Sequence, residues 1–276
     1  MKLIWVIAVV IFSTACNTKG TEKKAVELNA KPKVDYSLDR EHEVVDTKMM
    51  DNGLVIEWYE KGNGEKVKNG DLLNIDYKVR LKDGDIVDGN HLIKKETFPF
   101  LVGFEMQTKG WDLALKEMKV GDFARIRIPS ELARGEKGVP GLIPPNAENF
   151  LSIRIISKQK PNRTIDGVKV WILEENENNK VKFDEGKSIV FHAMVSSPSN
   201  PLYSNTFRSN QPFTYKLGDY GLIPGLRKAL INAKSADRMY VLVPASEAYG
   251  DKGYLNIVKP NEDLFYNIFV MDVLKK

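Results

Sequence analysis

The sequence is poor in the residues that build disulfide frameworks and metal sites. Its 276 residues include one cysteine and three histidines. A single cysteine excludes an internal disulfide, so the folded parts of the chain must depend on their hydrophobic cores. The histidines are His42, His91 and His192. Because they are widely separated in the sequence, we expect no metal site.

The sequence also lacks a strong excess of one charge. It has 41 Lys and Arg against 37 Asp and Glu, and the basic residues are scattered along the chain. This pattern does not favour a nucleic-acid partner. An apolar fraction of 42% and a charged fraction of 28% are typical of a mainly folded soluble protein. A chain of 276 residues has room for about two domains, each with its own core.

The apolar run at the N-terminus is short. LIWVIAVVIF, residues 3–12, follows Lys2 and precedes small residues and Cys16. Ten apolar residues are too few to span a bilayer, so the run indicates an export signal. The segment resembles a bacterial lipoprotein signal, which implies a signal peptide over residues 1–15 and lipidation at Cys16. Ser13 stands where that family usually has an aliphatic residue, so ordinary secretion remains the alternative.

The lipoprotein resemblance implies an exported protein of the cell envelope, held at the membrane by its lipid anchor and facing the periplasm. Residues 16–51 are polar and charged. Such a composition cannot bury enough apolar surface to fold alone, so we expect a tether there.

The rest of the chain contains an internal repeat. PSELARGEKGVPGLIPPNA, residues 129–147, aligns with PASEAYGDKGYLNIVKPNE, residues 244–262, at an offset of 115. Solenoid repeats are only about 20–50 residues long, so this offset predicts two whole domains. We expect domain 1 over residues 52–158, a linker over 159–165 around Pro161, and domain 2 over 166–276.

Alternating apolar residues predict short strands in each domain. In domain 1 the pattern covers residues 54–60, 72–81, 123–129 and 150–156. Residues 110–118 have helical spacing, with Trp111, Leu115 and Met118 on one face. We therefore expect an α+β fold, in which each domain is an antiparallel sheet wrapped over one short helix.

Several motifs in order give the chain a family resemblance. Domain 1 resembles an FKBP-type peptidyl-prolyl cis-trans isomerase over residues 53–158, through DYKVRLKDGDIVD, FPFLVG, GWDLALKEMKVGDFARIRIPSELARG and GVPGLIPPNAENFLSIRI. Domain 2 resembles the same family more distantly, through PFTYKLGDYGLIPGLRKAL, MYVLVPASEAYGDKG and VKPNEDLFYNI. The resemblance implies isomerisation of bonds before proline, with proline-containing polypeptide segments as partners and no cofactor. We expect a monomer.

The resemblance implies a proline pocket in domain 1. Its catalytic residues would be Tyr77, Asp88 and Trp111, and its substrate-binding residues Val87, Phe98, Ile143, Leu151 and Arg134. Arg134 stands where the family has a tyrosine that bonds the substrate carbonyl, and a charge there is costly to desolvate. We expect weakened activity. The alternatives are that Trp111 is only the core anchor of its helix, Tyr77 only a core tyrosine, and Asp88 only a solvated carboxylate.

Domain 2 keeps a different subset of the pocket. The implied substrate-binding residues are Tyr203, Phe213, Leu222, Ile223, Tyr249, Val258 and Tyr266. It has Ala193, Ser204 and Leu226 in place of the strand tyrosine, the carboxylate and the tryptophan. We expect SSPSNPLYSN, residues 196–205, to form a surface loop, and His192 to face solvent.

The sequence therefore supports an envelope peptidyl-prolyl isomerase that assists folding of exported proteins, chiefly through domain 1. The alternative is a non-catalytic chaperone or partner-binding module built on degenerate pockets. A purely structural duplication is a third possibility.

Overall fold

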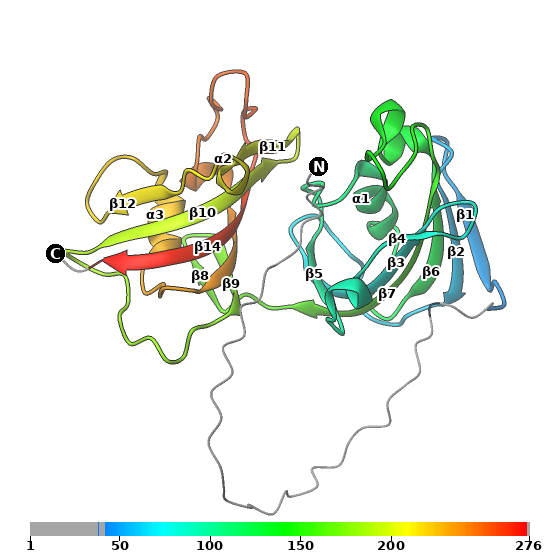
Figure 1. Ribbon diagram of the computed structural model, residues 1–276, viewed down its shortest axis with the longest axis horizontal. Helices are drawn as coiled ribbons and strands as arrows, with labels where there is room; N and C mark the ends of the chain where they lie inside the picture. The colour runs from blue at the N-terminus through cyan, green and yellow to red at the C-terminus, as the bar shows by residue number, and fades with distance from the viewer. Residues whose placement is uncertain (1–37, 39–41, 275–276) are drawn as a thin grey trace, which may run out of the picture.

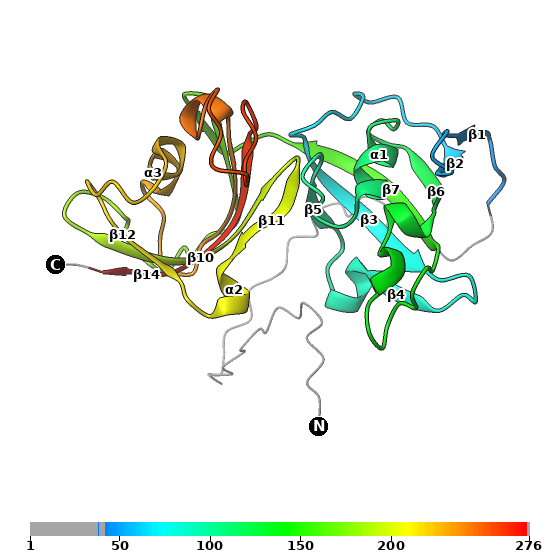
Figure 2. The ribbon, with the colours of Figure 1, turned by 90° about the horizontal axis from the view of Figure 1, so that it is seen from above.

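The computed structural model describes Leu38 and residues 42–274. The expected signal peptide, Cys16 and most of the expected tether lie outside these residues. The described chain forms two domains that lie side by side (Figures 1 and 2). Among the described residues, no helix is long and apolar enough to cross a membrane.

Domain 1 is a seven-stranded antiparallel sheet with one α-helix. Its elements are β1 (Asp46–Met49), β2 (Val55–Glu60), β3 (Leu72–Arg80), β4 (Ile86–Gly89), the 3-10 helix η1 (Asn90–Ile93), β5 (Phe98–Leu101), α1 (Lys109–Leu115), β6 (Phe123–Ile128), η2 (Ser130–Leu132), η3 (Gly135–Lys137) and β7 (Asn149–Gln159). The strand order is β1-β2-β6-β7-β3-β4, and β5 also pairs with β3.

Domain 2 repeats this topology strand for strand. Its elements are β8 (Arg163–Ile165), β9 (Val168–Glu174), β10 (Ser188–Ser197), β11 (Asn200–Asn205), α2 (Thr206–Ser209), β12 (Phe213–Lys216), α3 (Pro224–Leu230), β13 (Arg238–Val243), η4 (Ala245–Glu247) and β14 (Leu264–Leu274). The strand order is β8-β9-β13-β14-β10-β11, with β12 on β10. The expected pair of antiparallel α+β domains is confirmed, but domain 2 has two α-helices, α2 and α3, where one was expected.

Short edge strands are the main difference from the sequence-based expectation. β1 lies within the expected tether, β8 within the expected linker, and β11 within the expected surface loop. Each of them pairs at or near the end of a sheet, with β2, β9 and β10 respectively. None of these three strands buries one whole face, so their sequences show no clear alternation of apolar and polar residues. Backbone hydrogen bonds to the neighbouring strand hold them in the sheet.

His192 is also placed differently from the expectation. Its side chain is only 8% exposed. Its Nδ1 lies 3.0 Å from Oγ1 of Thr206, and its ring stacks on Phe207 with centroids 4.9 Å apart. The short helix α2 therefore covers the face of β10 that the alternation pattern assigned to solvent.

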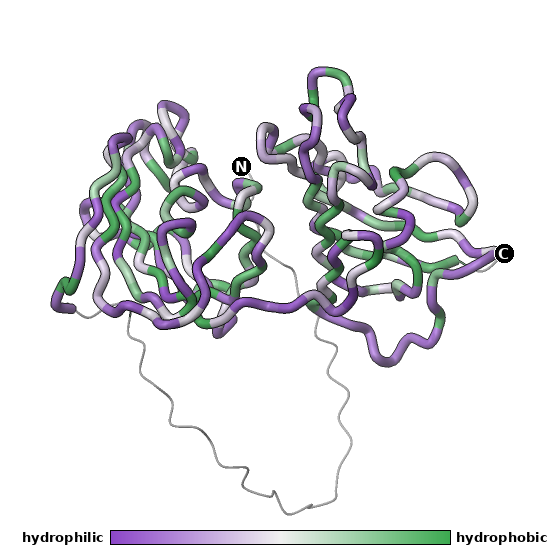
Figure 3. The backbone as a smooth tube through the Cα atoms, turned by 180° about the vertical axis from the view of Figure 1, so that it is seen from behind, coloured by the Kyte–Doolittle hydropathy of each residue, from purple (hydrophilic) through white to green (hydrophobic). Residues whose placement is uncertain are grey.

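The core of each domain lies between the sheet and its helix. In domain 1, Trp111, Leu115 and Met118 are all buried as predicted, but α1 ends at Leu115, so Met118 lies after the helix and not on its last turn. Gly110 allows α1 to approach β6, because a Cβ at this position would lie 2.4 Å from Cγ2 of Ile128. The hydrophobic residues follow the strands of both domains (Figure 3).

A third apolar cluster joins the two domains. Domain 1 contributes Leu72, Leu101 and Phe104, and domain 2 contributes Trp171, Tyr240, Leu242 and Phe265. An ion pair of 2.8 Å between Lys95 Nζ and Glu174 Oε1 also crosses the junction. Each domain thus buries part of its apolar surface against the other.

Candidate functional site

Two loops with the same backbone structure lie at the upper side of the domains in Figure 1. They are residues 129–147 and 244–262, here called flap 1 and flap 2. In flap 1, Val139 N–H donates to the carbonyl of Ile143 over 2.8 Å; in flap 2, Tyr254 N–H donates to the carbonyl of Val258 over 2.9 Å. Ile143 and Val258 are both buried. The sequence repeat is therefore also a repeat of loop conformation.

The floor of the domain 1 site is aromatic. Trp111 on α1 stacks on Phe100, with centroids 5.4 Å apart and an interplanar angle of 20°. Tyr77 on β3 meets the indole edge-on at 5.1 Å, and Phe98 lies 5.7 Å from Tyr77. The neighbouring rings hold the indole in one orientation, so it presents a rigid flat surface.

A chain of polar side chains runs along the rim. Tyr77 Oη donates to Asp88 Oδ1 over 3.1 Å, and Gln107 Nε2 donates to Asp88 Oδ2 over 3.1 Å. Arg134 Nη2 in turn donates to Gln107 Oε1 over 2.8 Å. Burial raises the pKa of the Tyr77 hydroxyl, and the negative charge of Asp88 raises it further. Tyr77 therefore remains a neutral donor at physiological pH.

The rim and the floor enclose a small cavity. Its volume is about 20 Å³, and it is lined by Val79, Val87, Asp88, Gln107, Thr108, Trp111, Arg134, Ile143 and Asn149. Five of the lining residues were predicted from the sequence, and Leu151 lies beside the cavity as the strand partner of Val79. A cavity of this size has room for about one water molecule. Gln107 and Arg134 both line this cavity, and the hydrogen bond between them is exposed to solvent.

Gln107, Thr108 and Asn149 are pocket residues that the sequence-based site list did not contain. Thr108 Oγ1 and Asn149 Oδ1 are buried and have no hydrogen-bond partner. At the repeat offset of 115, domain 2 has Ile223 and Leu264 at the places of Thr108 and Asn149. The contrast between the repeats was the signal that could have identified these two polar residues.

The strand register agrees with the substitutions that the family resemblance implied for the strands of domain 2. Ala193 pairs with Ile268 as Tyr77 pairs with Ile153. Ser204 likewise pairs with Val195, just as Asp88 pairs with Val79.

The floor residue of domain 2 is Leu226, which is buried on α3 where α1 has Trp111. Domain 2 therefore has neither the indole floor nor the carboxylate of the rim.

The seven residues predicted for domain 2 gather around one core. Val258 and Tyr266 belong to it, and the partly buried Tyr203, Phe213, Leu222, Ile223 and Tyr249 pack against it. The hydroxyls of Tyr203 and Tyr249 lie 3.0 Å apart, and Tyr249 stacks on Tyr254 with centroids separated by 4.7 Å. Burial raises the pKa of Tyr266 and of Tyr203. This site is a cluster of tyrosine side chains.

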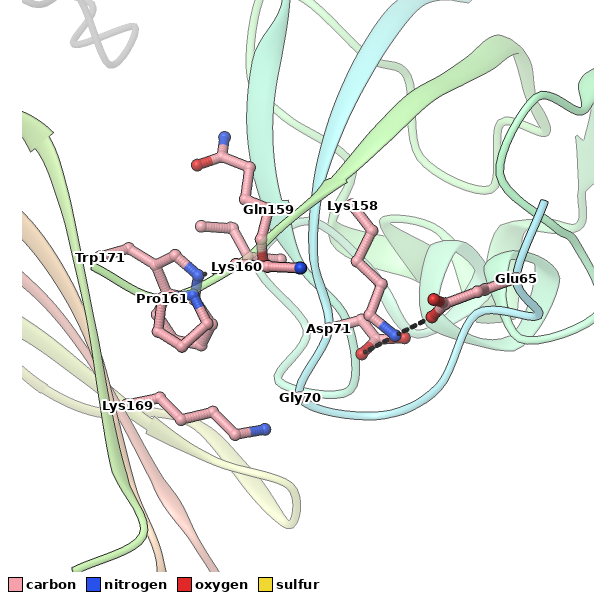
Figure 4. Close-up of a pocket in the computed structure, with 10 residues that line it drawn as sticks. Glu65, Gly70, Asp71, Lys158, Gln159, Lys160, Pro161, Lys169 and Trp171 are labelled. Atoms are coloured by element: carbon pink, nitrogen blue, oxygen red, sulfur yellow. Dashed lines mark hydrogen bonds and ion pairs between the residues drawn. The ribbon is translucent and has the colours of Figure 1, made fainter. Parts of the chain in front are cut away.

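A larger cavity of about 170 Å³ lies between the domains (Figure 4). There Lys158 Nζ bridges Glu65 Oε2 at 2.9 Å and Asp71 Oδ1 at 3.0 Å, and Trp171 lines the opposite side. None of the predicted site residues lines it. In the part of the chain that the structure describes, no group of three or more His, Cys, Asp or Glu side chains could hold a metal ion.

Several known proteins are similar to this chain in sequence. A curated relative, peptidyl-prolyl cis-trans isomerase FKBP10 of Homo sapiens, is 28% identical over 75% of this chain and 35% of its own length. FK506-binding protein 4 of Rhizopus delemar is 37% identical over 38% of this chain and 27% of its own length. The crystal structure of FkpA from Escherichia coli is 34% identical over 41% of this chain and 51% of that chain, with a TM-score of 0.38. The chain spans about a third of the length of FKBP10 and less of the fungal relative.

The family model for FKBP-type peptidyl-prolyl cis-trans isomerases matches the chain twice. The matches cover residues 63–156 and 179–271, one in each domain, and together they include about two thirds of the sequence. The chain therefore belongs to the FKBP-type peptidyl-prolyl cis-trans isomerase family, with two such domains in tandem.

Proposed function

We propose that domain 1 catalyses cis–trans isomerisation of peptide bonds before proline in other polypeptides. The observation that carries the proposal is the aromatic floor under flap 1. Trp111 offers a flat apolar surface of proline-ring size, and Tyr77 and Phe100 fix its orientation. The family membership supports the same reaction.

The reaction makes and breaks no covalent bond. The barrier to rotation about the bond is about 18–20 kcal/mol, so the uncatalysed step takes tens of seconds. An acceleration of roughly a thousandfold needs about 4 kcal/mol of transition-state stabilisation. The twisted amide has lost conjugation and is less polar than the planar one. A dry pocket that favours the twisted amide is therefore sufficient.

The charged rim of domain 1 opposes this activity. Gln107 and Arg134 line the cavity and form a hydrogen bond with each other. A substrate that packs against Arg134 partly desolvates the guanidinium group, which costs free energy. We therefore expect slower turnover than an apolar rim would allow.

Exchange spectroscopy on a proline-containing peptide tests the proposal. The purified full chain should accelerate cis–trans exchange, and Trp111→Leu should abolish most of the acceleration. Point variants are preferable to isolated domains because the domains share the apolar cluster around Phe104 and Phe265. A full chain that leaves the exchange rate unchanged would exclude the catalytic function.

We propose that the enzyme acts in the cell envelope on exported proteins, with a lipid anchor at Cys16. The support is the short apolar run at residues 3–12, followed by small residues and the only cysteine. Cys16→Ala protein should leave the membrane fraction and appear in the soluble fraction after cell lysis. Unchanged partitioning of this variant would exclude the anchor.

Domain 2 supports a second candidate function, the binding of unfolded chains without catalysis. It lacks the indole floor, and its surface near the site carries exposed large apolar residues. Tyr220, just before α3, is 95% exposed, and Leu255 on flap 2 is 77% exposed. The full chain should suppress aggregation of a client without proline, and Trp111→Leu should leave this suppression intact. Loss of suppression in Trp111→Leu would instead tie binding to domain 1.

A further inference from the structure

Arg134 is an exposed residue at the rim of the pocket, and its side chain contacts few other side chains. A guanidinium group has five N–H donors. Among the described residues, its one hydrogen-bond partner is Gln107 Oε1, a neutral acceptor. Asp88 accepts hydrogen bonds from Tyr77, Gly89 and Gln107, and it acts on Arg134 through its charge without a hydrogen bond between them. A cation at the pocket rim thus lacks a carboxylate in direct contact.

Thr108 is a second unused donor in the same cavity. It occupies the N-cap position of α1, but its side chain makes no capping hydrogen bond. It is 6% exposed, and its Oγ1 has no partner. A buried hydroxyl without a partner is costly, so this group favours a ligand with an acceptor.

We propose that domain 1 selects prolines that stand next to an acidic residue, with Arg134 as the specificity-determining residue and Thr108 as a second donor. This inference rests on the proposed isomerase function and names its substrate class. The carboxylate of the neighbouring Asp or Glu replaces Gln107 as the acceptor for Arg134.

Replacement of Gln107 by the substrate carboxylate, as the acceptor for Arg134, favours binding of an acidic substrate. The Gln107–Arg134 bond is part of the lining of a cavity that holds about one water molecule. A bond from a guanidinium to a carboxylate is charge-assisted and is stronger than one to a neutral amide. An acidic side chain therefore gains a stronger contact when it replaces Gln107 as the acceptor for Arg134. An apolar neighbour of proline makes no such contact.

Domain 2 provides the internal contrast. At the repeat offset of 115 it has Tyr249 for Arg134 and Ile223 for Thr108. The Tyr249 hydroxyl already contacts that of Tyr203 at 3.0 Å. No cation and no unused hydroxyl occur at these two positions, so acidic selectivity belongs to domain 1 alone.

Matched peptides test the selectivity. The peptides carry Glu or its neutral isostere Gln before the proline, and a second pair carries them after it. Both dissociation constants and exchange rates are measured with the full chain. In at least one pair, we expect the Glu peptide to bind and exchange about fivefold better than the Gln peptide at low salt. The ratio should fall as ionic strength rises.

Three variants assign the effect. Arg134→Gln should make the Glu and Gln peptides bind and exchange about equally, so that their ratio is about one. Thr108→Val should lower the ratio. Lys137→Gln removes a charge of the same sign from flap 1 at a residue that does not line the cavity, so it should keep the ratio. Thermal unfolding of each variant checks that the fold is retained.

The outcomes separate this inference from the proposed function. Equal binding of Glu and Gln peptides by the wild-type chain, or a ratio that survives Arg134→Gln, overturns the selectivity. A ratio that falls equally in Lys137→Gln also overturns it, because a general charge effect then suffices. If Glu peptides bind more tightly but no peptide exchanges faster, the selectivity stands and the isomerase function fails.

Discussion

The two domains share one backbone topology, but different side chains line their pockets. Their strand orders match, and their flaps make the same backbone hydrogen bonds. Domain 1 has an indole floor at Trp111 and a charged rim at Asp88 and Arg134. Domain 2 has an aliphatic floor at Leu226 and a rim of phenols. The fold therefore positions a pocket, and the side chains alone decide what that pocket does.

The differences between the domains compensate one another in volume. Where domain 1 has the large Tyr77 and Trp111, domain 2 has Ala193 and Leu226. Where domain 1 has the smaller Val87 and Leu151, domain 2 has Tyr203 and Tyr266. Protein interiors tolerate neither voids nor overlap, so the loss of aromatic side chains on one side of the pocket accompanies their gain on the other. The site in domain 2 is therefore packed with a different set of side chains.

Giving domain 1 the floor residue of domain 2 should have the largest effect. We expect Trp111→Leu to lower kcat/KM for proline exchange at least tenfold, because the flat surface for the proline ring is lost. Exchange spectroscopy on the full chain measures the change. Trp58→Phe is the matched control.

Trp58 is buried in domain 1 and donates to Asp122, and it does not line the cavity. Its substitution should cost about 1–3 kcal/mol of unfolding free energy and leave kcat/KM unchanged. If Trp111→Leu kept full activity, the difference between Trp111 in domain 1 and Leu226 in domain 2 would not affect catalysis.

The apolar junction should decide whether the domains can be compared as independent units. Phe104 is 3% exposed, and its ring lies 5.9 Å from that of Phe265 in domain 2. Phe104→Ala should cost about 3 kcal/mol and split one calorimetric transition into two. Leu202→Ala, at a residue that is 55% exposed, should change stability by less than about 0.5 kcal/mol. A single unshifted transition in Phe104→Ala would show that the cluster does not couple the domains.

The phenol rim of domain 2 should contribute stability and no catalysis. Tyr203→Phe removes the contact with the Tyr249 hydroxyl and should cost about 1 kcal/mol in urea unfolding. The proline exchange rate should stay the same. Tyr220→Phe, at a side chain that is 95% exposed, serves as the control and should be neutral in both assays. A slower exchange rate in Tyr203→Phe would place catalysis in domain 2 as well.

Alkaline pH should destabilise domain 2 slightly more than domain 1. Burial raises the pKa of Tyr266 and Tyr203 in domain 2, and of Tyr77 in domain 1. A tyrosine whose folded-state pKa is raised contributes stability that is complete below the unfolded pKa of about 10 and is lost as pH rises above it. For Tyr266 the loss begins near pH 10 and grows as the pH rises further.

Tyr266→Phe should therefore reduce the drop in unfolding free energy between pH 9 and pH 10. Urea titrations at the two pH values measure it. An equal drop in the variant would show that Tyr266 ionises as easily in the folded state as in the unfolded state.

The features predictable from the sequence are local or periodic. The offset of 115 aligned the flaps, and alternation along β3 placed Tyr77 inside, where it is 3% exposed. Helical spacing placed Trp111 in the core. These predictions succeeded because a strand or helix converts sequence spacing directly into direction. The site residues of domain 1 were carried over from the family resemblance, and the structure brings them together around one cavity and the strands beside it.

Other features depended on contacts between distant segments. The burial of His192 depends on α2, and the strand character of β8 and β11 depends on the neighbours that pair with them. The hydrogen bond between Gln107 and Arg134 joins two residues that are 27 positions apart. No short window of sequence contains both partners of such a contact.

The sequence by itself determined two antiparallel domains with their repeated flaps, because these follow from spacing and from turn residues along one stretch of chain. Only the tertiary structure decided that Arg134 reaches across to Gln107, that Thr108 has no partner, and that Phe104 packs against domain 2. Side-chain hydrogen bonds and domain contacts are set by where the backbone brings distant residues, and that information belongs to the fold as a whole.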